Sequence, residues 1–519
     1  MGKSKKFHKN KVVSGTQKHQ VKSDISNGNI FTIRNFLIAL LVIRFVSGVF
    51  YSVVPVHGLH IWRQTDVLSV AYSYYLRYFV EGNFSHFFLP SILNTDNGEF
   101  SIVRMEFPLV NFIISPAFVF GPYWGKVIAN LMILFINYGL VLFNYRLLRN
   151  IKICSVNAGL AVLLLPNFSF TAIWTTRVMP DVISMLLTLT AVSLSWNKER
   201  PVLSFIFASL GLLVKPTSIV VLLLNLLKQN TFIKTLKTKS IIYDLMWGIG
   251  SVIVALTYYF IVIRYIGTFE VHNHFNVAIK NPIEQLESFF GSDDPMSLDY
   301  LFSVRLLCPP YIAWLIPGVI SIQMMLMPYL GLFILLFGAF LFLICYRYII
   351  AWRAIVIFVV QLLMIAALDG EHSFVHFYYY VGTTFAFAIV FIGYLTNIWK
   401  WCKPFLILIL LLQFADIINF EIGDYFTGHF QWNPQSRVAF YNECSALKKS
   451  HPELPWHSGY VFNGPQLDNE QAAGLGICFG ERERLHGANY GFYYKWDQMP
   501  ENCYVIDNTE HINLAVCKN

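Results

Sequence analysis

The chain has 519 residues, of which 56% are hydrophobic and 13% are charged. Soluble domains carry roughly 45–50% apolar and about 25% charged residues, so the composition excludes an ordinary water-soluble protein. The formal net charge of +8 comes partly from a lysine-rich polar segment over residues 1–30. This segment has no apolar core and is not expected to be a cleavable signal peptide. We expect a solvated cytoplasmic tail, with contact to anionic lipid as the alternative.

Long apolar segments with few charges follow this tail. A helix of roughly 20 apolar residues crosses a hydrocarbon core of about 30 Å. Continuous runs do not fit the alternating pattern of a β-barrel. We therefore predict an all-α polytopic membrane protein with about eleven spans, two of them short. The predicted spans are Phe31–Val54, Val127–Tyr145, Cys154–Trp174, Val182–Trp196, Val202–Val214, Thr217–Leu227, Ile241–Ile266, Ile322–Cys345, Ala354–Leu368, Phe377–Ile392 and Phe405–Phe420.

Basic residues gather on one side of this path. With a cytoplasmic start, the first span carries the chain outward, and the inner loops then hold the basic clusters, as the positive-inside rule requires. We interpret the apolar segment Phe107–Pro122 as a helix along the outer interface, because counting it as a span would invert every later loop. The inner clusters contain Arg146, Arg149, Lys152, Lys198, Arg200, Lys228, Lys234, Lys237, Lys239, Arg347, Arg353, Lys400 and Lys403.

Two regions face outward on this path. A long first outer loop occupies residues 55–126, and residues 421–519 follow the last span. The second region has a common size for an independent domain, and we expect a small mixed α/β extracytoplasmic domain there, after a transmembrane domain over residues 31–420. Its even number of cysteines predicts disulfide bonding, with reduced buried thiols as the alternative. These cysteines are Cys444, Cys478, Cys503 and Cys517.

Three outer-face carboxylates lie near arginines. Arginine binds phosphate oxygens through its planar fork. One carboxylate can take a proton from an attacking hydroxyl, and two can hold a divalent cation such as Mg²⁺, Mn²⁺ or Zn²⁺. The set predicts a site for a lipid-borne phosphate, with Asp66 and Glu106 as candidate metal ligands; helix caps are the alternative at Asp66 and Asp181. The neighbours are Arg63 and Asp66, Arg104 and Glu106, and Arg177 and Asp181.

Five motifs appear in a fixed order along the chain. They read W-R-Q-x-D at Trp62–Asp66, E-x-P-L at Glu106–Leu109, M-P-D at Met179–Asp181, G-L-L-x-K-P at Gly211–Pro216 and H-x-Y-Y at His376–Tyr379. In this order they resemble the C-type glycosyltransferases, in particular the family 39 enzymes, which include protein O-mannosyltransferases and lipid A aminoarabinose transferases. The resemblance covers about residues 31–400.

The resemblance implies a function and a set of roles. The donor would be a polyprenyl-phosphate sugar, and the acceptor a lipid, glycan or protein on the extracytoplasmic side, with inversion at the anomeric carbon. The implied catalytic residues are Asp66, Glu106 and Asp181. The implied donor-phosphate residues are Arg63, Arg104, Arg177, Lys215, His376, Tyr378 and Tyr379, although an interfacial aromatic belt is an equal alternative for the last three.

The chain departs from this pattern at Phe107, where the aminoarabinose transferases have lysine. Arg104, Lys215 or Arg177 are the candidates to supply the missing charge. Two other functions stay open: a transporter or flippase of lipid-linked glycans, and a catalytically inactive family member. A transporter is expected to place polar groups near the bilayer midplane in broken helices, whereas the acids here gather at one face. We expect membrane lipids but no nucleic acid as partners, and a bacterial inner membrane as the location.

Overall fold

The structure is a computed structural model that is mostly helical, with two small sheets. The residues that it describes are 27–52, 61–85, 88–93, 100–102, 106–149, 155–167, 175–198, 200–227, 238–266, 352–361, 364, 381–397, 407–408, 410–411, 414–415, 443, 446–447, 449–451, 490–494, 501, 503–510 and 512–517.

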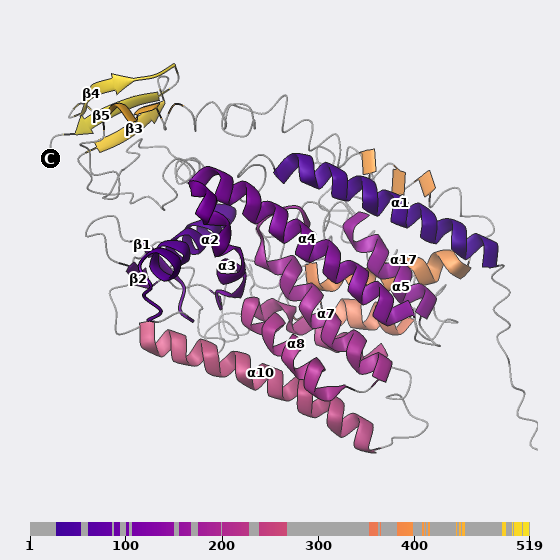
Figure 1. Ribbon diagram of the computed structural model, residues 1–519. Coiled ribbons are helices and arrows are strands. Elements are labelled where there is room, and N and C mark those ends of the chain that lie inside the picture. The colour runs from indigo at the N-terminus through magenta and orange to yellow at the C-terminus, as the bar shows by residue number, and fades with distance from the viewer. Residues whose placement is uncertain are drawn as a thin grey trace, which may run out of the picture.

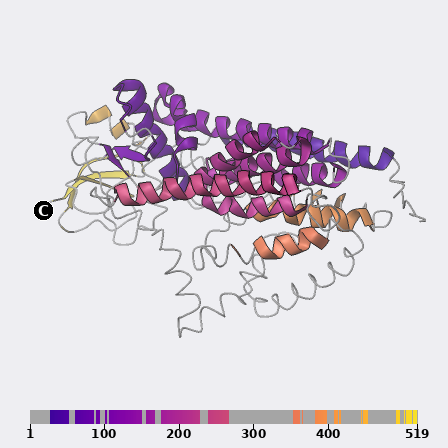
Figure 2. The ribbon, with the colours of Figure 1, turned by 90° about the horizontal axis from the view of Figure 1, so that it is seen from below.

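Apolar helices pack side by side to form the body of the molecule (Figure 1). Within this body α7 packs against α4 and α8, and α8 packs against α10. Figure 2 shows α10 running along one side of the other helices. Two helices begin at prolines because the first turn needs no N–H from its first residue. The helices are α1 (Asn27–Ser52), α4 (Gly121–Arg149), α5 (Ser155–Leu164), α7 (Pro180–Lys198), α8 (Pro201–Val214), α10 (Thr238–Ile266) and α17 (Thr384–Asn397).

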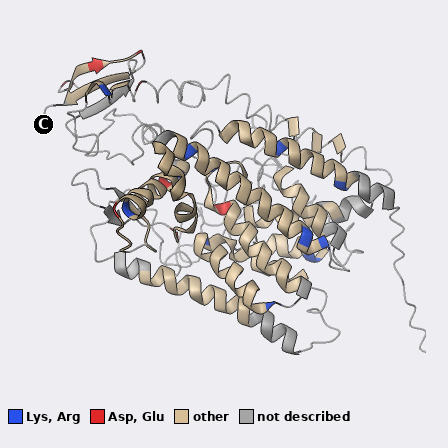
Figure 3. Cartoon of the chain, in the orientation of Figure 1, with Lys and Arg blue, Asp and Glu red and all other residues tan. Residues whose placement is uncertain are grey.

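The surface of this helical body fits a lipid environment. Large apolar side chains point outward, with Phe50 73%, Met246 65% and Phe260 63% exposed. Charged residues are few along the helices, and the last turn of α4 carries a basic pair (Figure 3). Of the described residues, Ile33–Ser52 and Trp124–Arg149 are long and apolar enough to cross a membrane by length and composition. The count of about eleven spans, which includes segments outside the described residues, stays a prediction.

The first outer loop begins with a helix that starts earlier than the sequence suggests. Helix α2 spans Ile61–Tyr74 and continues into one π-helical turn, η1 (Tyr75–Val80). Asp66 therefore lies in the second turn, so its interpretation as an N-cap is wrong. A cap residue stands at the helix boundary with non-helical dihedral angles, and here the residues before Asp66 are already helical. A short antiparallel hairpin follows, formed by β1 (Ser91–Leu93) and β2 (Phe100–Ile102), with Ser91 opposite Ile102.

The predicted interfacial helix is present as two short helices. α3 (Leu109–Ile114) has Pro108 as its N-cap and continues into the 3₁₀ helix η2 (Ser115–Phe120). Gly121 then adopts a φ of 86°, which side-chain-bearing residues rarely reach, and turns the chain into α4. Val119 and Phe120 are 62% and 64% exposed, which suits contact with lipid. The location of α3 and η2 at the outer membrane interface stays a prediction.

Helix α8 ends abruptly at Val214. Pro216 disfavours helical geometry at the residue before it, and Lys215 is extended, with φ −155° and ψ 113°. The chain resumes as η4 (Pro216–Ser218), α9 (Ile219–Leu222) and η5 (Leu223–Leu227). The predicted spans on either side of Lys215 are therefore two separate helical pieces joined by a turn. Residues 184 and 191 of α7 contact Gly211 and Ser204 of the first piece, and residues 188 and 195 contact Ser218 and Asn225 of the second, so the two pieces run in opposite directions.

Side chains from α7 and η4 donate to carbonyl groups on both sides of the break. The last carbonyl groups of any helix lack partners inside it. Here the Ser184 hydroxyl donates to the Gly211 carbonyl at 2.7 Å and to the Lys215 carbonyl at 3.2 Å, and the Ser218 hydroxyl donates to the Lys215 carbonyl at 2.9 Å. Because these bonds cross from α7 to α8, they fix where Lys215 leaves the helix.

A three-stranded antiparallel sheet with the order β3-β5-β4 occupies the end of the chain, away from most of the helices (Figure 1). Its strands are β3 (Tyr490–Tyr494), β4 (Cys503–Asn508) and β5 (Ile512–Cys517). Ser450 and His451 both contact the Asp507 carboxylate of this sheet, at 3.1 Å and 3.0 Å. Cys503 is disulfide-bonded, which confirms the expected disulfide bonding for this cysteine. The limits of the predicted domain at residues 421–519 stay a prediction.

Gly211 permits the close approach of α7 and α8. A Cβ atom there would lie 2.2 Å from Thr188 Oγ1 and 2.9 Å from the Ser184 carbonyl oxygen. We expect Gly211→Ala to force the helices apart and to lower the free energy of unfolding by ~1–3 kcal/mol, measured as a lower melting temperature in detergent. The control Gly139→Ala has nothing within 4 Å and should melt like the wild type or slightly higher. Equal melting of the two variants would contradict this role.

Candidate functional site

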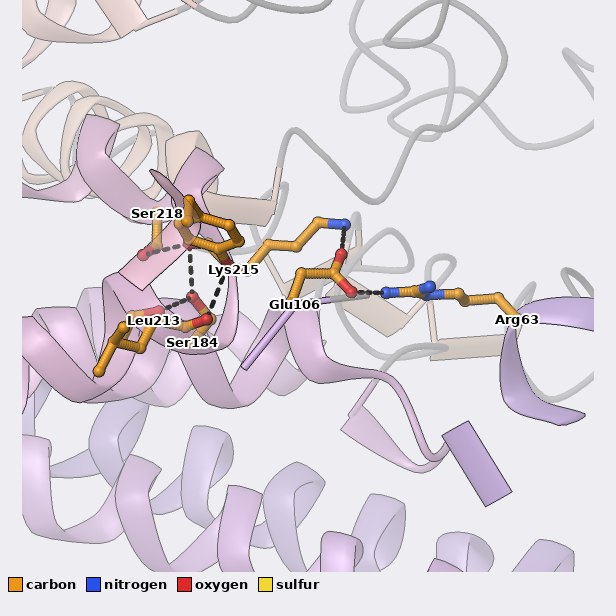
Figure 4. Close-up of polar contacts among 8 residues, drawn as sticks. Arg63, Glu106, Ser184, Leu213, Lys215 and Ser218 are labelled. Carbon is orange, nitrogen blue, oxygen red and sulfur yellow. Dashed lines mark hydrogen bonds and ion pairs between the residues drawn. The ribbon is translucent and has the colours of Figure 1, made fainter. Parts of the chain in front are cut away.

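An ion-pair cluster joins three segments that lie far apart in the sequence. Glu106, in the first outer loop, lies between Arg63 of α2 and Lys215 at the end of α8 (Figure 4). Lys215 Nζ is 2.5 Å from Glu106 Oε1, and Arg63 Nη2 contacts Glu106 Oε2. The side chains of Arg63 and Lys215 are 8% and 7% exposed, and that of Glu106 is 17% exposed. Each carboxylate oxygen therefore has its own cation.

The two cations decide the charge of Glu106. Burial alone would raise the pKa of this carboxyl group, but Arg63 and Lys215 outweigh burial and hold the pKa well below its ordinary value. Glu106 is thus ionised at neutral pH and engaged at both oxygens. A carboxylate in this state is a weak proton acceptor and a strong organiser of cations.

The backbone keeps Glu106 next to Lys215. The Phe107 amide N–H donates to the Leu213 carbonyl at 3.2 Å, which pins the loop to the end of α8. The extended conformation of Lys215 turns its side chain out of the helix and toward this loop. Lys215 and Glu106 are 109 positions apart in the sequence, and their contact therefore depends on the end of α8 at Val214.

Asp181 is buried beside this cluster and has no ion pair of its own among the described residues. It is the second residue of α7 and is 4% exposed. Neither carboxylate oxygen has a hydrogen-bond partner within the described part of the chain, so its interpretation as a helix cap is wrong. Lys215, Arg63 and Glu106 all interact with it electrostatically. A buried polar group without a hydrogen bond is costly, and a ligand hydroxyl or cation would remove that cost.

Two other predicted residues lie nearby in the chain. Asp66 is 3% exposed and stands three residues after Arg63 in α2, which places both on one helix face. Arg177 is 3% exposed and precedes α7, but it forms no ion pair or hydrogen bond with Glu106. Of the two described candidates for the charge missing at Phe107, Lys215 is the one that contacts Glu106. The predictions at Arg104, His376, Tyr378 and Tyr379 lie outside the described residues.

The sequence-based reasoning missed two tyrosines of α10. The rings of Tyr258 and Phe107 pack edge to face, with their centroids 5.1 Å apart and an angle of 85° between the ring planes. The Tyr259 hydroxyl donates to the Leu213 carbonyl at 2.8 Å. The available signal was a pair of adjacent tyrosines in an otherwise apolar span, a pattern that is also typical of the membrane interface.

The described residues give a metal ion no complete set of ligands. They contain no group of three or more His, Cys, Asp or Glu side chains suited to a metal, and both oxygens of Glu106 already contact cations. The metal predicted at Asp66 and Glu106 stays a prediction.

Comparison with known proteins gives one structural likeness. No protein-family model matches the chain, and no curated protein matches it by sequence. The chain is similar to the crystal structure of ArnT from Cupriavidus metallidurans in the apo state, at 8% identity and a TM-score of 0.40, over 93% of this chain and 98% of that chain.

The ion pairs predict a defined pH dependence of stability. Glu106→Gln removes the charge while keeping the shape, and should lower the free energy of unfolding by ~1–3 kcal/mol at neutral pH. Because the pKa of Glu106 is depressed on folding, its contribution is present above the unfolded value of about 4.3 and is lost as the pH falls further.

Melting temperatures of both proteins from pH 8 to pH 3 test this expectation. The difference between wild type and Glu106→Gln should stay constant down to about pH 5 and then shrink. Glu81→Gln, a change of an exposed outer-loop residue, serves as the control and should show no such trend. A difference that grows in acid would overturn the assignment.

Proposed function

We propose that the protein is a membrane glycosyltransferase that moves a sugar from a polyprenyl-phosphate carrier to a lipid, glycan or protein acceptor on the extracytoplasmic face. One observation carries the proposal: two buried cations, Arg63 and Lys215, converge on Glu106 beside a buried Asp181 that has no hydrogen-bond partner in the described residues. The motif order supports the same reading.

Arg63 and Lys215 are suited to the donor phosphate. Glu106 holds both head groups close together, and two cations fixed at one place are preorganised for an anionic group. An arginine fork and a lysine ammonium are common ligands of phosphate oxygens. The phosphate leaves with the electron pair of the broken sugar–oxygen bond, and the two cations stabilise the charge that then develops. Glu106 keeps these cations in place.

The proton must go to a different carboxylate. In the proposed step the acceptor hydroxyl attacks the anomeric carbon from the face opposite the phosphate, a carbon–oxygen bond forms, and the hydroxyl proton passes to a base. We assign this base to Asp66, which shares a helix face with Arg63. Asp181 would accept hydrogen bonds from hydroxyl groups of the bound sugar. A divalent metal, if one binds with Asp66, would offset phosphate charge.

The membrane setting completes the proposal. We place the N-terminal tail in the cytoplasm, about eleven spans in a bacterial inner membrane, and the C-terminal domain outside. The apolar outward faces of α1 and α10 support a lipid environment, and a lipid-linked donor reaches such a site from the bilayer.

A transfer assay tests the function. The lipid-reconstituted protein is incubated with radiolabelled polyprenyl-phosphate sugars and membrane extracts, and wild type is compared with Asp66→Asn, Asp181→Asn and Lys215→Met. We expect Asp66→Asn to lower kcat by about 10²–10⁴-fold, as loss of a general base does. Lys215→Met should raise the KM for the donor, because it removes a phosphate ligand.

Glu81→Gln is the control and should behave like the wild type. Each variant must keep the wild-type elution volume and helical content for its kinetics to count. If no sugar is transferred by the wild type, or if folded Asp66→Asn and Asp181→Asn match it, the enzyme assignment fails. Transport of lipid-linked glycans would then be measured in the same vesicles.

A further inference from the structure

We infer that Tyr258 and Tyr259 of α10 are positioning residues, which hold the Glu106 loop against the end of α8 and so keep Lys215 and Glu106 paired. The kinetic part of this inference rests on the proposed function, but its structural part does not. Neither tyrosine belongs to any of the motifs described above, and both come from a helix that carries no residue of the ion-pair cluster.

The Leu213 carbonyl is the point where three segments meet. Because α8 ends at Val214, this carbonyl is a last-turn acceptor without a partner inside its helix. It accepts the Tyr259 hydroxyl at 2.8 Å and the Phe107 amide N–H at 3.2 Å. One backbone oxygen thus joins α10, α8 and the residue that follows Glu106.

Tyr258 fixes the same loop at two further places. Its ring packs edge to face on Phe107, and its hydroxyl donates to the Phe88 carbonyl at 3.0 Å. Phe88 lies just before strand β1 and Phe107 a few residues after strand β2, so Tyr258 contacts both ends of the hairpin region. Aromatic pairs of this geometry add stabilisation beyond the burial of their area. Helix α10 therefore clamps the base of the loop that carries Glu106.

The tyrosines are also close enough to affect the cluster by charge. Glu106 interacts electrostatically with both tyrosine side chains, and Arg63 with Tyr259. The ring centroids of Tyr258 and Tyr259 are 5.4 Å apart, so a shift of one ring moves the other. Loss of either hydroxyl should let the loop move away from Lys215 and lengthen the contact between Lys215 and Glu106.

Hydrogen exchange tests the clamp without any assay of function. Tyr259→Phe keeps the ring and removes one hydroxyl, and Tyr258→Phe does the same at the Phe88 contact. We expect faster amide exchange over residues 106–109 in both variants, at unchanged global melting temperature. Phe260→Leu, at a neighbouring position that is 63% exposed, is the matched control and should exchange like the wild type.

Kinetics then separate positioning from simple support of the fold. Tyr259→Phe should raise the KM for the donor about 3- to 10-fold, the range that loss of one hydrogen bond gives. It should leave kcat unchanged, because the proposed base Asp66 is not touched. In a Glu106→Gln background the same change should leave the KM where it is, since the pair that the tyrosine positions is already broken.

The inference is overturned if exchange over residues 106–109 in both tyrosine variants equals that of Phe260→Leu. It is also overturned if the variants transfer sugar with the wild-type KM, or if Tyr259→Phe raises the KM as much in the Glu106→Gln background as in the wild type. A wild type that transfers no sugar would count against the proposed function alone, since the exchange measurement still decides whether α10 holds the loop.

Discussion

The site depends on one local constraint, the incompatibility of Pro216 with a helical residue before it. This constraint ends α8 at Val214 and extends Lys215, so that a lysine that would otherwise continue a helix points at the outer loop. The same break leaves carbonyl groups without helical partners. For one of them, the Leu213 carbonyl, Tyr259 and Phe107 supply the partners from other parts of the chain. A single proline thus directs Lys215 toward the Glu106 loop and exposes the carbonyl group to which α10 and this loop bind.

The charges divide the work among carboxylates that look equivalent in the sequence. Glu106 has a cation on each oxygen and stays ionised, which suits it to hold Arg63 and Lys215. Asp181 is equally enclosed but has no hydrogen-bond partner among the described residues, so it is free to meet a ligand. The environment, and not the residue type, separates an organiser of cations from an acceptor of hydrogen bonds.

The sequence predicted the helical class, the apolar outer helix after Pro108 and the motifs that contain Arg63, Glu106, Asp181 and Lys215. It could not choose Lys215 from three candidate cations, because the pairing joins residues 109 positions apart, and periodicity carries no information at that separation. The cap interpretation of Asp66 failed because α2 begins five residues earlier, at Ile61. The cap interpretation of Asp181 failed because the M-P-D motif does not show whether its carboxylate accepts a hydrogen bond, and within the described residues it accepts none. Tyr258 and Tyr259 escaped notice because tyrosines near a membrane surface need no special role.

The Lys215–Glu106 pair also bears on how the chain enters the membrane. On the predicted topology the turn after α8 lies on the outer side, where a lysine opposes the preference for basic residues in the cytoplasm. Glu106 is synthesised earlier and already stands on that side when Lys215 arrives. Pairing offsets part of the misplaced charge inside the protein, since Glu106 is shared with Arg63. The contact that equips the site for an anion would therefore also keep the α8–α9 turn from slipping back toward the cytoplasm during biogenesis.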